Sequence, residues 1–379
     1  MRNKNIYKSI IAELSESGAA YAERFASFYI ASIGAHRLNL ANQRYEFYVR
    51  SRKAEDTRLH ILFIAPPGFS KTFWLAQFLR GKYALLANSG IDTTMEATLT
   101  GAGFVGTVKF SGQGESVREP GLAESHSTGI IGVEEFAAIT GMFKKQHSSE
   151  LDTALLQALD SGYVYKRLAA GPIKYRTYLT LHTGCQPARV DLTSGLGRRF
   201  VFVEYIPTRA DFRMMTDARR SAKGKHANEP RLNQIRADIK QMGEDMNNIK
   251  DVQIDESFYR FMDDHNVIHY EEVLYERLLL GINVMQGNYD DRCLYGEMGT
   301  VASYLLNEEI NHRQSIKTGS EYSQVLTILR DFQGSADIDD VVEMLLTYGC
   351  DYTQAIELIA KMSKVGMIEK RGTKIYLKR

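Results

Sequence analysis

The stretch Ala65-Pro66-Pro67-Gly68-Phe69-Ser70-Lys71-Thr72-Phe73 decides the fold. It lies between the apolar residues 59–64 and a helical pattern that continues to residue 79. A strand that breaks into a proline and glycine turn and re-enters as a helix directs backbone N–H groups and a helix N-terminus at one point. The pattern predicts a phosphate-binding loop at residues 66–73, in which Lys71 reaches the outer phosphates and the Thr72 hydroxyl ligates Mg²⁺. The alternative is an ordinary strand-turn-helix corner with an exposed lysine.

A second motif supplies carboxylates. The apolar run 129–133 ends in Glu134 and Glu135. Phosphoryl transfer needs an acidic group near the metal and another that orients the attacking water. We therefore expect Glu134 beside Mg²⁺ and Glu135 as the water-orienting base. The alternative is a buried strand that is followed by acidic residues without a function.

Composition sets broad limits on the function. The chain has 379 residues, 44% of them hydrophobic, which is enough for two or three domains with buried cores. Its net charge of +1 means that a nucleic-acid partner would have to be bound by local basic patches. Three widely spaced cysteines favour a reducing cytoplasm over a disulfide framework or a paired-cysteine zinc site. No apolar run approaches the ~20 residues that cross a bilayer, so no membrane partner is expected.

The chain divides into segments with different patterns. Residues 1–55 predict a helical leader that packs on the rest of the protein. In residues 56–207, β-rich runs at 59–64, 128–133, 178–182 and 200–205 alternate with helical patterns, which predicts a parallel α/β sheet covered on both faces. Residues 208–250 predict an exposed helical or linker stretch, and residues 252–312 are expected to be helical throughout, so that 208–315 forms a helical lid and linker.

Residues 316–379 have a pattern of their own. Helical patterns at 320–332, 338–346 and 352–365 precede two short strands around Arg371-Gly372, an arrangement that predicts a winged helix. Lys370, Arg371 and Lys374 lie in its basic hairpin, and residues 361–379 carry seven basic side chains against Glu369 alone. Such a domain binds nucleic acid through a helix and the wing, or binds protein, and the sequence leaves both open.

Four segments together resemble a known family. In order and spacing, residues 59–72, 98–107, 119–124 and 129–136 are similar to the AAA+ core of the minichromosome maintenance (MCM) replicative helicases. That family accepts a small residue other than glycine before the loop lysine, as Ser70 is here. The resemblance implies an α/β fold in which an AAA+ P-loop parallel sheet is flanked by helices and followed by a helical lid and a C-terminal winged helix. It also implies a version that lacks the family's N-terminal domain, as a virus or other mobile element would encode.

The resemblance assigns further roles. Residues 181–187 match the strand whose polar residue before proline senses the γ-phosphate, which nominates Gln186 where the family usually has asparagine. Residues 195–200 match the segment with the arginine finger, which nominates Arg199, with a surface pair of Arg198 and Arg199 as the alternative. A finger that acts on a neighbouring subunit requires a homo-oligomer, and the family implies a hexameric ring.

Two hairpins are expected to meet the nucleic acid. By resemblance, the glycine-rich residues 101–121 form one hairpin and residues 162–176 the other. The family's tip lysine falls on Ala169, so Lys166, Arg167 and Lys174 are the expected contacts to the phosphate backbone, with a solvated hairpin arm as the alternative. Glu134 also replaces the family's usual aspartate.

These observations favour a ring-forming ATPase that hydrolyses ATP with Mg²⁺ to translocate on, or unwind, single- or double-stranded DNA during replication. The alternative is a nucleotide-gated DNA-binding initiator or adaptor in which ATP is mainly structural.

Overall fold

The computed structural model describes residues 4–16, 23–45, 56–69, 71–110, 116–135, 149–168, 171–187, 199–221 and 227–378. Its α-helices are α1 (Ile6–Glu16), α2 (Glu23–Tyr45), α3 (Lys71–Leu79), α4 (Gly101–Val105), α5 (Leu122–Ser125), α7 (Ser149–Leu159), α8 (Arg209–Ser221), α9 (Glu229–Asp245), α10 (Glu256–Asp264), α11 (His269–Gln286), α12 (Thr300–Asp331), α13 (Ile338–Thr347) and α14 (Tyr352–Lys364). Its strands are β1 (His60–Ile64), β2 (Thr93–Glu96), β3 (Gly106–Phe110), β4 (Ser116–Pro120), β5 (Ile130–Val133), β6 (Tyr163–Leu168), β7 (Gly171–Arg176), β8 (Thr180–Cys185), β9 (Phe200–Glu204), β10 (Asp251–Ile254), β11 (Cys293–Gly296), β12 (Ser335–Asp337), β13 (Ile368–Arg371) and β14 (Lys374–Leu377).

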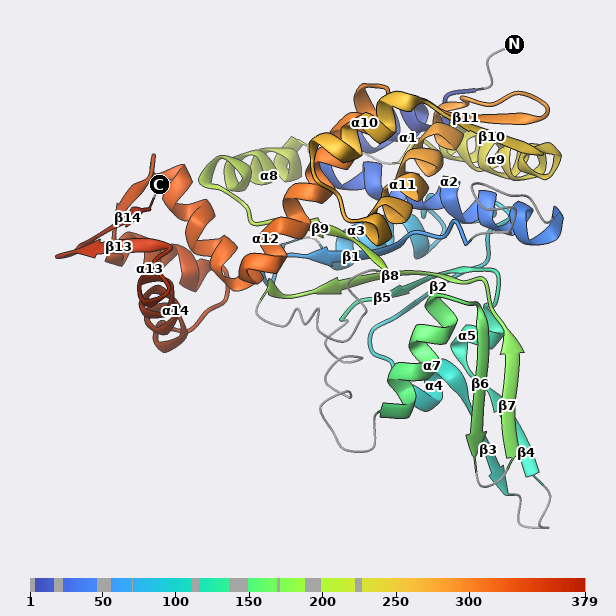
Figure 1. Ribbon diagram of the computed structural model, residues 1–379, viewed down its shortest axis with the longest axis horizontal. Helices are drawn as coiled ribbons and strands as arrows, with labels where there is room; N and C mark the ends of the chain where they lie inside the picture. Colours follow the sequence, from blue (N-terminus) through green and yellow to red (C-terminus); the bar gives the residue numbers. More distant parts are fainter. Residues whose placement is uncertain are drawn as a thin grey trace.

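A five-stranded parallel sheet with the order β2-β5-β8-β1-β9 forms the centre of the molecule (Figure 1). All residues of β1, β5 and β8 are buried, which explains the apolar runs of β1 and β5, whereas β8 carries buried polar residues such as His182. The four strands that the sequence predicts are confirmed as β1, β5, β8 and β9, and helices flank the sheet as expected. The edge strand β2 escaped prediction because its sequence Thr-Thr-Met-Glu is only half-buried and lacks an apolar run.

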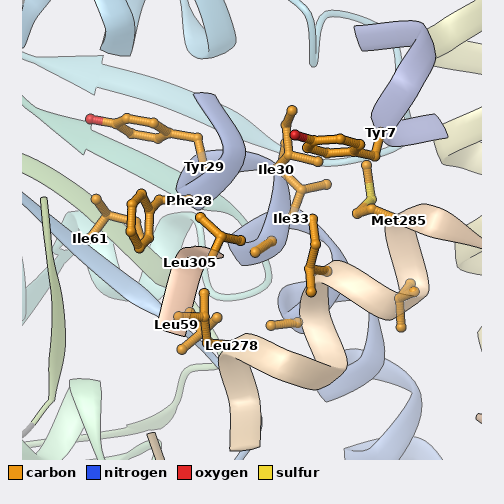
Figure 2. Packing of buried hydrophobic residues seen from close by; sticks show 14 of the residues in the cluster. Tyr7, Phe28, Tyr29, Ile30, Ile33, Leu59, Ile61, Leu278, Met285 and Leu305 are labelled. Carbon is orange, nitrogen blue, oxygen red and sulfur yellow. The ribbon is translucent and has the colours of Figure 1, made fainter. Parts of the chain in front are cut away.

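Helices α1, α2, α9, α10 and α11 and the first half of α12 form one layer on one face of the sheet. Helix α2 packs between the sheet and α11, and Figure 2 shows Phe28 of α2 beside Ile61 of β1 in the same cluster as Leu278 and Leu305. Glycines permit the close crossing of the two helices: a Cβ at Gly34 would lie 2.1 Å from the Gly281 carbonyl oxygen. The leader is thus a packing element, as expected, and it shares its core with the expected lid.

The opposite face of the sheet carries a different layer. Helices α4, α5 and α7 pack there with the hairpins β3–β4 and β6–β7, which lie side by side and extend away from the sheet (Figure 1). The inward residues Val164 and Ile173 of the second hairpin are fully buried in this cluster. Both expected hairpins are therefore present.

Two expectations for residues 208–312 are wrong in part. Helix α9 is not simply exposed, because Leu232, Ile235 and Ile239 are buried against the N-terminal layer. Residues 252–312 are not helical throughout, since β10 and β11 pair in parallel. These strands have only four residues each, too few for a period-2 pattern to stand out from the helical patterns around them.

The C-terminal residues form a compact unit with its own core. Helices α13 and α14 pack with the end of α12 against an antiparallel sheet of order β12-β14-β13. The hydroxyls of Ser315 and Ser323 in α12 are hydrogen-bonded, although eight residues of straight helix would separate them by about 12 Å. Helix α12 therefore bends sharply beside the expected boundary at residue 316. Within the described ranges, no helix combines the length and apolar character needed to cross a membrane.

Candidate nucleotide-binding site

The expected phosphate loop lies at the carboxyl end of β1. The Ala65 N–H donates to the Cys185 carbonyl at 3.1 Å and so continues the pairing of β1 with β8. The chain then turns, with the Phe69 N–H 3.4 Å from the Pro66 carbonyl and Gly68 at a φ of 80°. That left-handed conformation favours glycine at position 68. Ser70 lies outside the described residues, and α3 begins directly after it at Lys71.

Lys71 folds back over this loop. Its Nζ donates to the carbonyl oxygens of Ala65 at 2.7 Å and Pro66 at 2.9 Å. The side chain is half-buried, so the ammonium remains at the surface of the site. Neutral carbonyl partners favour a lysine less than an anion would, and an anion beside the loop could therefore replace them.

Gly184 is a residue of this site that the sequence motifs did not single out. A Cβ at position 184 would lie 2.9 Å from the Glu134 carbonyl oxygen and 3.2 Å from Cδ of Lys71. Glycine in β8 thus lets the stem of Lys71 and the end of β5 approach each other. The available signal was a glycine inside a strand pattern, which often marks a close approach of another chain segment.

Thr72 and Glu134 come together although they are 62 residues apart. The Thr72 hydroxyl lies 3.3 Å from Oε2 of Glu134, and Nη1 of Arg80 lies 3.6 Å from Oε1 of the same carboxylate. A hydroxyl and one carboxylate fit Mg²⁺, which binds through few protein oxygens and keeps water and phosphate ligands. Across the part of the chain that the structure describes, no cluster of three or more His, Cys, Asp or Glu could form a closed protein cage for a metal.

Glu135 and Gln186 lie on the same edge of the sheet. Both are half-buried, and each follows the carboxyl end of its strand, β5 for Glu135 and β8 for Gln186. Because β8 lies between β1 and β5, Gln186 comes between the loop and the acidic residues. The sheet thus brings Lys71, Thr72, Glu134, Glu135 and Gln186 to one edge.

The remaining loop residues have different environments. Pro66 is buried, Pro67 and Phe73 are exposed, and the Phe73 ring packs edge-on against Trp74 with centroids 5.3 Å apart. Phe69 points to the C-terminal unit instead, with its ring centroid 5.1 Å from Phe212 and 6.2 Å from Tyr348.

Arg199 lies at the amino-terminal ends of the strands, whereas the phosphate loop lies at their carboxyl ends. It precedes β9, whose first residue pairs with His60 at the start of β1, so it lies about 15 Å from the phosphate loop along the strands. Its Nη2 is 2.6 Å from Oδ2 of Asp160, and Arg199 is 8% exposed. Arg199 cannot reach the loop of its own chain, and a role in a neighbouring chain requires this ion pair to open. Arg198 lies outside the described residues.

The expected nucleic-acid residues of the second hairpin lie on two faces. Arg167 and Lys174 are on the exposed face, whereas Lys166 is half-buried on the face that carries Val164. Ala169, at the tip, lies outside the described residues. In the C-terminal hairpin, Lys370, Arg371 and Lys374 are all exposed.

The Arg371 charge in that hairpin is partly neutralised. Its Nε lies 3.0 Å from Oε1 of Glu369, and its Cζ lies over the Tyr376 ring, 5.3 Å from the ring centroid. Hydrogen bonding to Arg371 lowers the pKa of the Glu369 carboxyl.

No protein-family model matches the chain, and no curated protein matches it.

Proposed function

We propose that this chain is an MCM-like AAA+ ATPase that forms a ring, binds ATP with Mg²⁺ and uses hydrolysis to move on or unwind DNA. The observation that carries the proposal is the meeting of Lys71, Thr72 and Glu134 at the carboxyl edge of a parallel sheet. Ligands of open α/β sheets bind at this edge. The C-terminal order of helix, strand, two helices and two strands supports the winged-helix part.

Each side chain has a defined task in this proposal. Lys71 would exchange its carbonyl partners for the outer phosphate oxygens, and Thr72 with Glu134 would hold the metal. Bound Mg²⁺ would neutralise charge on the phosphates. Glu135 would accept a proton from the attacking water, and Gln186 would donate its amide N–H to the terminal phosphate.

The position of Arg199 supports the homo-oligomer in this proposal. Since it lies at the sheet edge away from its own loop, it would complete the site of a neighbouring chain and stabilise charge in the transition state. The homo-oligomer, a hexamer in this proposal, would bring the hairpins of several chains to one nucleic-acid strand.

The test is ATP turnover by the size-resolved oligomer with and without single-stranded DNA. Lys71→Ala should abolish nucleotide binding, and Glu135→Gln should keep binding but reduce turnover about 10²–10⁴-fold. Lys82→Ala and Glu229→Gln are matched controls, because these residues form an exposed pair at 3.7 Å elsewhere on the surface. A chain that stays monomeric with ATP and Mg²⁺ and shows no DNA-stimulated turnover would contradict the proposal.

A second candidate function has support from the C-terminal contact. Phe69 of the phosphate loop packs on Tyr348, and a Cβ at the neighbouring Gly349 would lie 2.9 Å from Cγ of Pro67. The loop thus contacts the turn between α13 and α14 directly. This contact favours an initiator or adaptor in which bound ATP positions the DNA-binding domain. If Lys71→Ala removes DNA binding while Glu135→Gln leaves every activity intact, this second function is correct.

A further inference from the structure

The outward face of the hairpin β6–β7 combines aromatic and basic side chains. Tyr163 and Tyr165 alternate along β6 and are 38% and 42% exposed. Across the ladder, Tyr163 pairs with Arg176 and Tyr165 with Lys174, while Arg167 continues the same face toward the tip. Their inward neighbours Val164, Ile173 and Tyr175 anchor the hairpin in the core, so the outward face is held in place.

The charge of this face has one sign. Residues 163–176 contain four basic residues and no aspartate or glutamate. Nζ of Lys174 lies 5.9 Å from the centroid of the Tyr163 ring, so a cation and an aromatic ring are adjacent. Exposed tyrosines beside cations, with no carboxylate in the hairpin, fit a polyanion that also carries flat apolar groups.

From this face we infer a stacking platform for single-stranded nucleic acid. Tyr163 and Tyr165 would each stack on a base, and Arg167, Lys174 and Arg176 would contact the phosphates. Residues two apart on a strand are roughly 7 Å apart along the backbone, which leaves room for one base at each tyrosine. In a duplex, both faces of every base are already stacked, so only unpaired bases can use the rings. The inference deepens the proposed function and rests on it for the choice of a nucleic acid, but it concerns the arm of the hairpin and not its tip.

The test is equilibrium binding of the full chain to dT20, rU20 and a 20-base-pair duplex, without ATP. The double variant Tyr163→Ala with Tyr165→Ala should weaken binding to a single strand about tenfold or more per ring, and leave duplex binding within twofold. The double Tyr→Phe variant keeps the rings and should bind within twofold of the parent. Tyr83→Ala is the matched control, because Tyr83 is 48% exposed and has Lys82 Nζ 4.4 Å from its ring centroid in another part of the molecule.

The basic residues have a separate readout. Replacing Arg167 and Lys174 with glutamine should reduce the slope of log affinity against log salt for dT20 by about 0.7 per charge removed. A loss of affinity for dT20 or rU20 in the Ala variant supports the platform. The inference is overturned if both strands bind the Ala variant as tightly as the parent, or if duplex binding falls equally.

The outcome is separable from the proposed function. If the chain shows no ATP turnover but the Ala variant loses single-strand affinity, the proposed motor fails and the platform remains. If DNA-stimulated turnover and single-strand binding both survive the Ala substitutions, the platform fails and the motor remains.

Discussion

Two groups of polar residues lie against the same sheet but differ in their exposure to solvent. At the carboxyl edge, Lys71, Thr72 and Glu134 are partly exposed and contact one another or nearby carbonyl groups. Between α2 and the sheet, His36 of α2 and His182 of β8 are completely buried, and they are hydrogen-bonded at 2.8 Å to Thr180 and Ser32 respectively. The comparison teaches that exposure separates polar residues that can bind a ligand from polar residues that hold layers together.

Burial changes the pKa of the histidines that lie between the layers. Burial lowers the pKa of His36, His60 and His182 from 6.5 to about 3. These histidines are therefore neutral in the folded protein at ordinary pH. They connect α2, the sheet and α7 instead of taking part in chemistry.

The largest expected effect is a loss of stability in acid. Because the folded-state pKa of each histidine lies below the unfolded value, its contribution to the free energy of unfolding is fully present above pH 6.5. That contribution is lost as the pH falls toward 3. At pH 5 the loss is about 2 kcal/mol per buried histidine, a large part of a typical free energy of unfolding. Urea denaturation at pH 7.5, 6 and 5 measures it.

Two variants sharpen this first prediction. His36→Gln and His182→Gln should each make the fall in the free energy of unfolding between pH 7.5 and 5 smaller, because each removes one buried imidazole. A free energy of unfolding that stays flat down to pH 5 would show that the buried cluster is not held neutral.

The second prediction concerns the packing of α11 on α2, in the helix layer that covers the buried histidines. A Cβ at Gly281 would lie 2.2 Å from the Ala31 carbonyl oxygen, so Gly281→Ala must push α11 away from α2. We expect a loss of about 3 kcal/mol in thermal or urea unfolding. Gly299→Ala is the control, because nothing lies within 4 Å of a Cβ there. Equal stability of the two variants would contradict the close crossing.

The third effect concerns the carboxyl edge. Gly184→Ala places a methyl group between Lys71 and the end of β5, so ATP turnover should fall about 10–100-fold, or roughly 1.4–2.7 kcal/mol in the barrier. The melting temperature should change less than in Gly281→Ala, since a Cβ at position 184 would lie 2.9 Å from a carbonyl oxygen and 3.2 Å from the lysine stem, compared with 2.2 Å from a carbonyl oxygen at position 281. Full turnover in Gly184→Ala would mean that the position of Lys71 does not depend on this contact.

The smallest effect tests the contact between the loop and the C-terminal unit. Phe69→Ala removes an aromatic contact to Phe212 and Tyr348 worth about 0.5–1.5 kcal/mol beyond its area. We expect a few-fold change in nucleotide affinity and faster proteolysis after residue 315. Phe110→Ala, at an exposed hairpin position, should change neither. If the two variants behave alike, the contact does not couple the loop to the C-terminal unit.

The sequence predicted the elements with strong periodicity. Four strands of the central sheet, together with the helices and the final hairpin of residues 316–379, were predicted because β-rich runs and one-sided helix stripes leave a regular pattern. The sequence did not predict β2, β10, β11 and β12, because strands of three or four residues with mixed side chains leave no such pattern. It nominated Lys71, Thr72 and Glu134 because a phosphate loop and an acidic strand exit have local signatures.

By itself, then, the sequence determined the elements with strong periodicity and the residues that carry candidate chemistry. Only the tertiary structure decided that Thr72 meets Glu134, that Gly184 makes room for Lys71, and that the face of the hairpin with Lys166 is the one turned toward the core. It also placed Arg199 away from its own loop and Phe69 against Tyr348. The physical reason is that sequence patterns record local periodicity and burial, whereas these contacts depend on strand order, register and the packing of segments far apart in the chain.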